Sequence, residues 1–400
     1  MTKTAKAMSE LRAISGEGVL VLTAFDAMQQ TKDGAAPFLQ EANFLWATGI
    51  EEPGWRLVVT PKEFYLVEPE KDETHRIFEG GLSRDEVSER CPGARIIAAK
   101  DLTVMYEQLS SLYETAMTIG DDPHADYYTF IQNPAPKRTW NELARFFTYV
   151  DDCRPHIARR RAVKSADEIA ALRQAISYTT RAFDVVHGQL REGSMQYEYE
   201  IEAAFTYEMR RKGADGHAYE PIVASGRNAL TLHYAHNSAQ LPRNGLVLID
   251  IGARAGAFSA DITRTFALGT PSKRELAVHE AVQRAQKDII ALIKPGVSLV
   301  AYQEAADDIM RRALLDLGLL SDAKDDDGFR RYFPHAVSHG LGIDVHESLG
   351  GFETFQPGMV LTVEPGIYIP EEGIGVRIED DILVTESGNE NLSEALTVAP

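Results

Sequence analysis

The chain has 400 residues, which is too long for one ordinary hydrophobic core and suits two domains. Hydrophobic residues make up 44% and charged residues 25%, values typical of a folded globular protein rather than a disordered one. The net charge of −19 disfavours a nucleic-acid partner, because phosphate binding needs clustered Lys and Arg. The one basic cluster, Arg159 to Arg161 with Lys164, is short, and we expect a solvated approach to a helix.

The sequence also favours a protein that works in the cytoplasm. No run of residues approaches the roughly 18–20 apolar positions that cross a bilayer, so no membrane partner is expected. The first ten residues have no apolar stretch behind them that would act as a signal peptide. Cys91 and Cys153 are the only cysteines, and they match no metal or redox spacing. Two cysteines in a chain of this length suit a reducing compartment.

Residues 1–158 predict a smaller α/β domain. Apolar, β-branched segments predict strands, and a helical pattern lies between later strand candidates. The strands are expected at 19–22, 55–59 and 64–67, and the helix at 102–113. The pattern breaks around residues 151–155, which places the second domain at 159–400.

The second domain repeats one order of helix signals. Ser165 with Glu168, and later Ser272 with Glu275, form capping boxes that begin long helices. A second helix is expected after each, at 197–212 in the first case and ending near Gly318 in the other.

The strand signals of the second domain repeat as well. Segments 245–250 and 358–364 each read as a glycine, an apolar strand and a carboxylate. Each is followed by a second acid-bearing segment, at 258–266 and 375–384. We therefore predict a duplicated helix–helix–strand–strand unit, whose two copies pack about a pseudo-twofold axis and converge on one central site.

The carboxylates in these apolar segments are unusual. Asp250 lies within the apolar strand candidate Leu246 to Ile251, where a charged carboxylate costs several kcal/mol unless it is paired or bound to metal. Asp261 follows after ten residues that include Gly252 and Gly256, a hairpin length that brings both acids to one face. Two such charges repel each other, and a divalent cation removes the repulsion.

The second copy supplies Glu364 and Glu379, which we also expect in strands. Three histidines lie between the copies in a loop-like segment: His335, His339 and His346. For any single acid a salt-bridged strand residue is an alternative interpretation, and for any single histidine a hydrogen-bonded structural role is. Four carboxylates and one neutral imidazole carry a charge of −4, which two divalent cations balance. Oxygen-rich ligand sets of this kind favour hard or borderline divalent ions.

At these residues the chain resembles the pita-bread metallopeptidases, in particular the Xaa-Pro aminopeptidase and Xaa-Pro dipeptidase (prolidase) branch. The resemblance covers residues 159–395 and is looser at 44–54. The segments that carry it are Leu232–Tyr234, Leu248–Gly252, Asp261–Phe266, Ser338–His346, Leu361–Gly366 and Arg377–Asp380.

The resemblance implies the roles of the site residues. Two divalent ions per subunit are expected, manganese first, with cobalt or zinc as alternatives. Their ligands would be Asp250, Asp261, His339, Glu364 and Glu379, of which Asp261 and Glu379 bridge both ions. His335, His346, Glu364 and Arg377 would act in catalysis, with Arg377 orienting Glu379 or meeting a substrate carboxylate. Substrate contacts would come from His233, Tyr234 and Tyr368.

The resemblance also implies the fold and the activity. The fold would be a smaller N-terminal α/β domain, followed by a C-terminal pita-bread catalytic domain. The enzyme would cleave the Xaa-Pro bond and release the first residue of peptides that have proline second. A prolidase restricted to dipeptides is the first alternative. The chain is expected to form a homodimer or homotetramer, with residues 1–158 serving substrate access and oligomerisation.

Three more distant interpretations share part of this pattern. Methionine aminopeptidases share the five ligand types but typically lack a separate N-terminal domain of about this size. Creatine-type amidinohydrolases share both domains but lack the complete ligand set. A non-catalytic peptide-binding pita-bread module would have an eroded metal site, and all five expected ligands are present here.

Overall fold

The computed structural model describes residues 3–122, 125 and 129–400. The chain divides into two compact units, Met1–Arg160 and Arg161–Pro400. Each unit has its own buried hydrophobic core. Within the described residues, every helix is too short or too polar to span a membrane.

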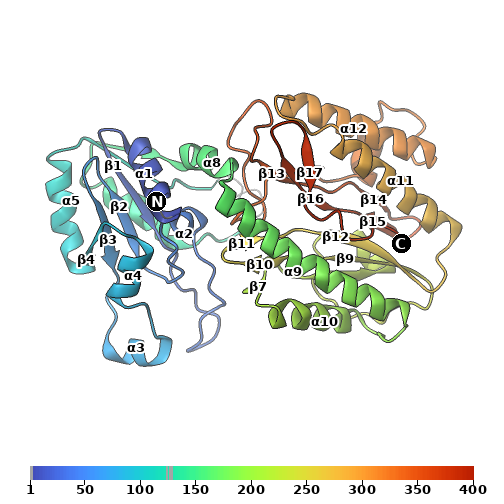
Figure 1. Ribbon diagram of the computed structural model, residues 1–400, viewed down its shortest axis with the longest axis horizontal. Coiled ribbons are helices and arrows are strands. Elements are labelled where there is room, and N and C mark those ends of the chain that lie inside the picture. Colours follow the sequence, from blue (N-terminus) through green and yellow to red (C-terminus); the bar gives the residue numbers. More distant parts are fainter. Residues whose placement is uncertain (1–2, 123–124, 126–128) are drawn as a thin grey trace. The chain divides into compact units, whose positions relative to one another are not determined.

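The first unit is built on one six-stranded mixed sheet, in the order β4-β3-β2-β1-β5-β6 (Figure 1). The strands expected near residues 19, 55 and 64 are confirmed as β1, β2 and β3. Strand β1 lies inside the sheet and is buried along its whole length, which explains its continuous apolar run. The strands are β1 Val19–Thr23, β2 Arg56–Val59, β3 Phe64–Glu68, β4 Ala94–Ala98, β5 Thr115–Thr118 and β6 Tyr149–Asp152.

Helices accompany this sheet. The helix expected from residue 102 is confirmed, although it ends at Ser110 rather than 113. The helices are α1 Lys3–Ser15, α2 Ala42–Thr48, α3 Glu73–Glu79, α4 Arg84–Arg90, α5 Leu102–Ser110 and α7 Pro134–Leu143, with the short η1 Ala99–Asp101. Helix α8, Arg154–Ala162, spans the division between the two units.

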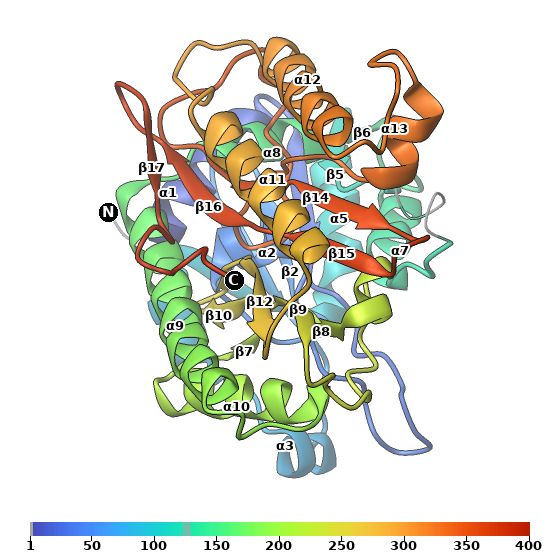
Figure 2. The same ribbon diagram turned by 90° about the vertical axis from the view of Figure 1, so that its right-hand side faces the viewer.

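In the second unit, two pairs of helices flank the strands (Figure 2). Both predicted capping boxes are confirmed: Ser165 and Glu168 begin α9, and Ser272 and Glu275 begin α11. In each box the serine side chain accepts a backbone N–H that the helix start leaves free. The helices are α9 Ala166–Arg191, α10 Glu198–Arg211, α11 Lys273–Ile290, α12 Leu299–Asp316 and α13 Asp326–Tyr332.

The strands of the second unit form two interrupted hairpins. In the first, β9 pairs with β12, and β10 pairs with β11 beyond a short break. In the second, β13 pairs with β16, and β14 pairs with β15 beyond another break. The strands are β7 Gly216–His217, β8 Ile222–Ser225, β9 Gly245–Asp250, β10 Ala253–Ala255, β11 Phe258–Ser259, β12 Thr263–Leu268, β13 Val360–Val363, β14 Gly366–Ile369, β15 Ile374–Arg377, β16 Asp380–Val384 and β17 Asn389–Asn391.

The expectation that all four acids lie within strands is wrong. Only Asp250 does, as the last residue of β9. Asp261, Glu364 and Glu379 lie in the breaks between β11 and β12, between β13 and β14, and between β15 and β16. Strand pairing is interrupted at these points, so the acidic side chains need not follow the in–out alternation of a pleated strand.

The two interrupted hairpins are hydrogen-bonded to each other beside the breaks. The Thr265 hydroxyl donates to the Arg377 carbonyl and accepts from its backbone N–H, at 2.9 and 3.3 Å. The Glu379 backbone N–H donates to the Thr263 carbonyl at 3.0 Å. Acids from both copies of the duplication are therefore held around one centre.

The expectation of a solvated basic run is wrong for its last members. Arg161 and Lys164 are buried, at 6% and 7% exposed, and both bind the buried Glu347 carboxylate. A buried charge is stable only when it is paired, and Glu347 lies too far along the chain for a sequence pattern to indicate that pairing. Arg159 and Arg160 are exposed, as expected.

A second buried ion pair joins the two copies. Arg264 on β12 donates to the Asp380 carboxylate at 2.6 Å and to the Glu379 carbonyl at 2.6 Å. Both side chains of the pair are almost fully buried, at 1% and 2% exposed. Burial alone would raise the pKa of Asp380, but Arg264 and the neighbouring hydrogen bonds lower it.

We expect Arg264→Leu to lower the free energy of unfolding of this unit by about 3–5 kcal/mol, because it leaves the Asp380 carboxylate buried and unpaired. Arg173→Leu is the matched control. It breaks a pair of the same length, 2.6 Å to Glu390, but both partners are 44% exposed. We expect its cost to stay below about 1 kcal/mol. Chemical denaturation of both variants checks this, and equal costs would contradict the importance of burial.

Candidate metal centre

The five predicted metal ligands come together in the second unit. They occur in three overlapping groups, and within each group the ligand atoms lie within 4.8 Å of one another. The groups are Asp250 with Asp261 and Glu379, His339 with Glu364 and Glu379, and Asp261 with His339 and His346. Within the described part of the chain, every group of this kind lies in this cluster.

His339 lies between the acids contributed by the two copies. Its Nε2 atom is 3.5 Å from an Asp261 oxygen and 3.3 Å from a Glu364 oxygen. Its Nδ1 atom lies 3.0 Å from the Gly340 carbonyl and can donate its proton there. That hydrogen bond fixes the tautomer and leaves the Nε2 lone pair facing the acids, the usual arrangement of a metal-binding histidine. Burial lowers the pKa of His339 to about 4, so the ring is neutral near pH 7.

The clustered acids repel one another. Burial raises the pKa values of Asp261, Glu364 and Glu379 well above their ordinary range, and the neighbouring carboxylates raise them further. A divalent cation would remove both the desolvation cost and the repulsion. The donors are carboxylate oxygens and one neutral imidazole, and this chemistry fits hard or borderline divalent ions.

The groups of candidate ligands share several members. Asp261 and Glu379 occur together in one group, and each also occurs in a group with His339. Glu364 and Asp250 each belong to a single group. A set of five ligands spread over overlapping groups is compatible with more than one divalent ion.

Asp250 and Glu379 are oriented by neighbours that the sequence did not indicate. The Tyr219 hydroxyl donates to Asp250 at 2.5 Å, and the Thr263 hydroxyl donates to Glu379 at 2.6 Å. Thr263 begins β12, and its hydrogen bond to Glu379 joins segments that are far apart in the chain. Tyr219 reaches Asp250 only through the fold, so no local pattern could have identified it.

Arg377 contacts Asp250 rather than Glu379. Its guanidinium donates to Asp250 at 2.5 Å, to the Tyr368 hydroxyl at 2.8 Å and to Thr263 at 3.1 Å. The side chain is 5% exposed. Burial alone would lower the pKa of Arg377, but Tyr368 and the surrounding acids raise it well above its ordinary value. Each of the three guanidinium nitrogens of Arg377 thus donates a hydrogen bond to a partner within the protein.

Two further histidines lie beside the acids. His335 Nδ1 is 3.6 Å from Glu364, and its Nε2 atom is 3.0 Å from the Tyr368 hydroxyl. Burial lowers the pKa of His335 to about 3. The His346 ring lies 4.3 Å from the His339 ring, and His346 also belongs to one of the three groups of candidate ligands.

The predicted substrate contacts differ in their surroundings. His233 is exposed. Tyr368 is buried against His335 and Arg377. The Tyr234 hydroxyl instead donates to Glu198 at 3.0 Å. Tyr368 therefore contacts His335, whereas the hydroxyl of Tyr234 is directed to Glu198.

The loop that carries His346 is held by ion pairs with two buried side chains, Arg161 and Lys164. Arg161 donates to Asp344 at 2.8 Å and to Glu347 at 2.5 Å, and Lys164 donates to the other Glu347 oxygen. The Glu347 backbone N–H donates to the Gly340 carbonyl at 2.8 Å, which closes the loop between His339 and His346. Burial alone would raise the pKa of Glu347, but the positive side chains of Lys164 and Arg161 lower it, so the carboxylate stays charged.

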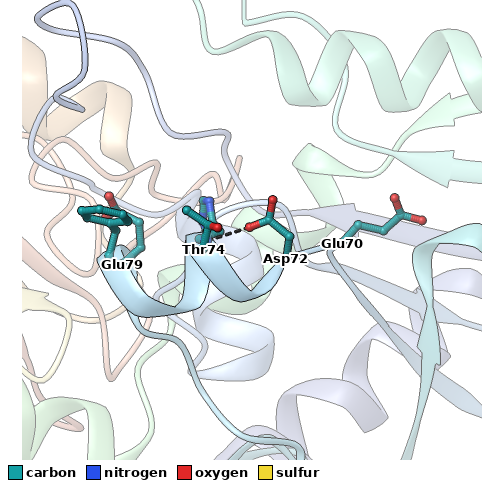
Figure 3. Close-up of a pocket in the computed structure, with 6 residues that line it drawn as sticks. Glu70, Asp72, Thr74 and Glu79 are labelled. Atoms are coloured by element: carbon teal, nitrogen blue, oxygen red, sulfur yellow. Dashed lines mark hydrogen bonds between the residues drawn. The ribbon is translucent and has the colours of Figure 1, made fainter.

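A pocket of about 410 Å³ in the first unit is not part of this centre (Figure 3). It lies along α3 and is lined by Glu70, Asp72, Thr74, His75, Phe78 and Glu79. Asp72 caps α3 by accepting the His75 backbone N–H at 2.7 Å, so this carboxylate has a structural role. The pocket contains none of the predicted site residues.

We expect Asp261→Ala to bind far less manganese than the wild type and to remain folded, because Asp261 belongs to two of the three ligand groups. We expect His346→Ala to keep its manganese and to lose most of its peptide hydrolysis. Asp215→Ala is a control, since its carboxylate contacts the β10–β11 turn at the Gly256 backbone and belongs to no ligand group. Elemental analysis after dialysis measures the three metal contents. Full metal content in Asp261→Ala would contradict the assignment.

Comparisons with known proteins agree with this centre. Residues 170–386 match the model of Metallopeptidase family M24, and residues 2–119 match that of the Aminopeptidase P, N-terminal domain. The chain is 33% identical to the Xaa-Pro aminopeptidase of Escherichia coli, over 96% of this chain and 92% of that protein. It is also 30% identical to the Xaa-Pro dipeptidase of Pyrococcus furiosus, over 72% and 77% of the two chains.

Solved structures agree over both domains. Aminopeptidase P from E. coli with the inhibitor Pro-Leu matches with a TM-score of 0.84 and 29% identity, over 99% of this chain and 95% of that one. Proline aminopeptidase P II from Yersinia pestis matches with a TM-score of 0.83 and 30% identity, over 99% and 97%. The predicted fold class, an N-terminal α/β domain and a C-terminal pita-bread domain, is confirmed. The chain belongs to metallopeptidase family M24.

Proposed function

We propose that the chain is a dinuclear Xaa-Pro aminopeptidase, which releases the first residue of peptides that have proline in the second position. The observation that carries the proposal is the convergence of four carboxylates and one imidazole from both copies of the fold. The proposal is supported by relatives named Xaa-Pro aminopeptidase that are similar along nearly the whole chain. It also agrees with the match of the first unit to an aminopeptidase P domain.

The five converging residues would hold the two cations: Asp250, Asp261, His339, Glu364 and Glu379. We propose manganese, although availability rather than ligand type decides among manganese, cobalt and zinc. A pair of divalent ions lowers the pKa of a water molecule and polarises a carbonyl group, which is what amide hydrolysis requires.

The side chains around the cations have distinct proposed tasks. Glu364 lies 3.3 Å from His339 and 3.6 Å from His335, where it would carry a proton from the attacking water to the departing proline nitrogen. We propose that His335 and His346 steady the bound peptide and the negative charge that develops on its carbonyl oxygen. Tyr368 would keep the His335 ring in place through their 3.0 Å contact.

A bond before proline requires a shaped pocket. Its nitrogen carries no proton, and the ring fixes φ, so an enzyme that binds substrates as a strand loses one hydrogen bond there. We propose that the ring sits among His233, His335 and His346.

The contacts of Arg377 favour an aminopeptidase over a dipeptidase. A dipeptidase must bind the free carboxylate that directly follows proline, and a bidentate arginine suits that task. Arg377 is buried and donates to Asp250, Tyr368 and Thr263 instead. We therefore propose that Arg377 positions Asp250 and Tyr368, which leaves the carboxyl side of the substrate unconstrained.

We further propose that the domain boundary lies near residue 158 and that residues 1–158 serve substrate access and oligomerisation, as a homodimer or homotetramer. A cytoplasmic location is supported by the two buried, free cysteines, Cys91 and Cys153.

We expect the manganese-loaded protein to hydrolyse Ala-Pro-Ala-Ala with a kcat/KM at least about tenfold above that for Ala-Pro, because Arg377 is not free to bind the dipeptide carboxylate. Ala-Ala-Ala-Ala tests the requirement for proline, and chelation of the metal should abolish the cleavage of every substrate. Preferred cleavage of Ala-Pro would show that the protein is a prolidase instead.

A further inference from the structure

Glu198 is a fully buried carboxylate outside the metal centre. It is the first residue of α10, and its side chain is 0% exposed. Its Oε1 atom accepts from the Ser225 backbone N–H, the Ser225 hydroxyl and the Asn228 amide, at 2.8, 2.8 and 3.0 Å. Its Oε2 atom accepts from the Tyr234 hydroxyl at 3.0 Å and the Ala239 backbone N–H at 2.9 Å.

All five donors come from one segment, residues 225–239. Ser225 begins it at the end of β8, Asn228 lies in the short helix η2 Gly226–Leu230, and Ala239 ends it. Tyr234 lies in the middle and packs its ring against the small apolar cluster around Leu248. One carboxylate therefore ties the start, the middle and the end of the segment together.

Glu198 is not needed to cap its own helix. The N-terminus of α10 is capped by Glu200, whose carboxylate accepts the backbone N–H groups of Gln196 and Tyr197 at 2.5 and 3.1 Å. Both oxygens of Glu198 are occupied by the 225–239 segment instead. The Glu198 side chain therefore constrains the 225–239 segment rather than the start of α10.

The segment borders the proposed substrate pocket. It carries His233 directly before Tyr234, whose ring packs against the apolar cluster that includes Leu248 on β9, the strand that ends in Asp250. Its helix η2 packs against β15, where a Cβ atom on Gly375 would lie 2.4 Å from the Ala229 carbonyl. This close contact leaves η2 and the strand that ends in Arg377 little freedom to shift independently.

We propose that Glu198 is a positioning residue that fixes His233 in the substrate pocket by clamping the 225–239 segment through Tyr234. The Tyr234 hydroxyl then serves the clamp rather than the peptide, which revises its expected role as a substrate contact. This inference rests on the proposed peptidase function of the same site.

The physical basis is the strength of hydrogen bonds to a buried charge. Hydrogen bonds to an ionised acceptor are shorter and stronger than neutral ones, and five of them converge on this carboxylate. Glu198→Gln replaces one carboxylate oxygen with an NH₂ group, which cannot accept the hydrogen bonds that reach this side of Glu198. The backbone N–H of Ser225 or of Ala239 then loses its partner, which is costly in a buried setting.

The test compares Glu198→Gln, Tyr234→Phe and the double variant with Glu200→Gln as the matched control on the same helix. Amide hydrogen exchange of the metal-loaded proteins measures the clamp without reference to activity. We expect faster exchange within residues 226–238 in Glu198→Gln and Tyr234→Phe, and unchanged exchange there in Glu200→Gln. Unchanged exchange in Tyr234→Phe would overturn the inference even if Glu198→Gln fails to fold.

Steady-state kinetics on Ala-Pro-Ala then test positioning. We expect Tyr234→Phe to raise KM about fivefold with kcat within about twofold, because ground-state and transition-state binding weaken together. If Tyr234 acts through Glu198, the double variant matches Glu198→Gln alone, whereas additive losses would show that the two residues act independently and would overturn the inference. An inactive wild type would contradict the proposed function, and the exchange experiment would still decide the clamp.

Discussion

The repulsion among buried carboxylates is the constraint on which the second unit depends. Asp261, Glu364 and Glu379 lie in the breaks of two hairpins, and their pKa values are raised by burial and by one another. Three such groups, with Asp250 beside them, are unfavourable unless cations neutralise them. The two hairpins are joined at Thr265 and Arg377, and this junction brings the repelling carboxylates together. A cation bound by acids from both copies would stabilise the contact between the copies.

Paired buried charges surround this centre and hold it in place. Arg377 and Tyr219 fix Asp250, and Arg264 pairs with Asp380 directly after Glu379. Farther out, Arg161 and Lys164 hold the histidine loop through Glu347, and Glu198 clamps the segment that carries His233. In each case a buried charge with several partners positions a residue of the site, so the site and the stability of the unit share the same interactions.

The sequence predicted features whose signals are local or that belong to family motifs. The capping boxes at Ser165 and Ser272 and the strand that ends in Asp250 follow from short-range patterns, and they are confirmed. The positions of Glu364 and Glu379 in strand breaks were missed, because a two-residue interruption leaves the apolar pattern almost unchanged. The partners of Arg161, Arg377 and Glu198 depend on contacts between segments far apart in the chain, and no spacing rule reports those.

We propose that two divalent cations replace protons on the buried acid cluster of the second unit. Calorimetric titration of the metal-free protein with manganese, repeated in buffers of different ionisation enthalpy, counts the ions bound and the protons released. Because the folded carboxyl groups have raised pKa values, they hold protons above the usual carboxyl range, and metal binding must displace them. We expect two ions to bind per chain, with more protons released as the pH is lowered. Binding of a single ion, or binding without proton release at any pH, would contradict it.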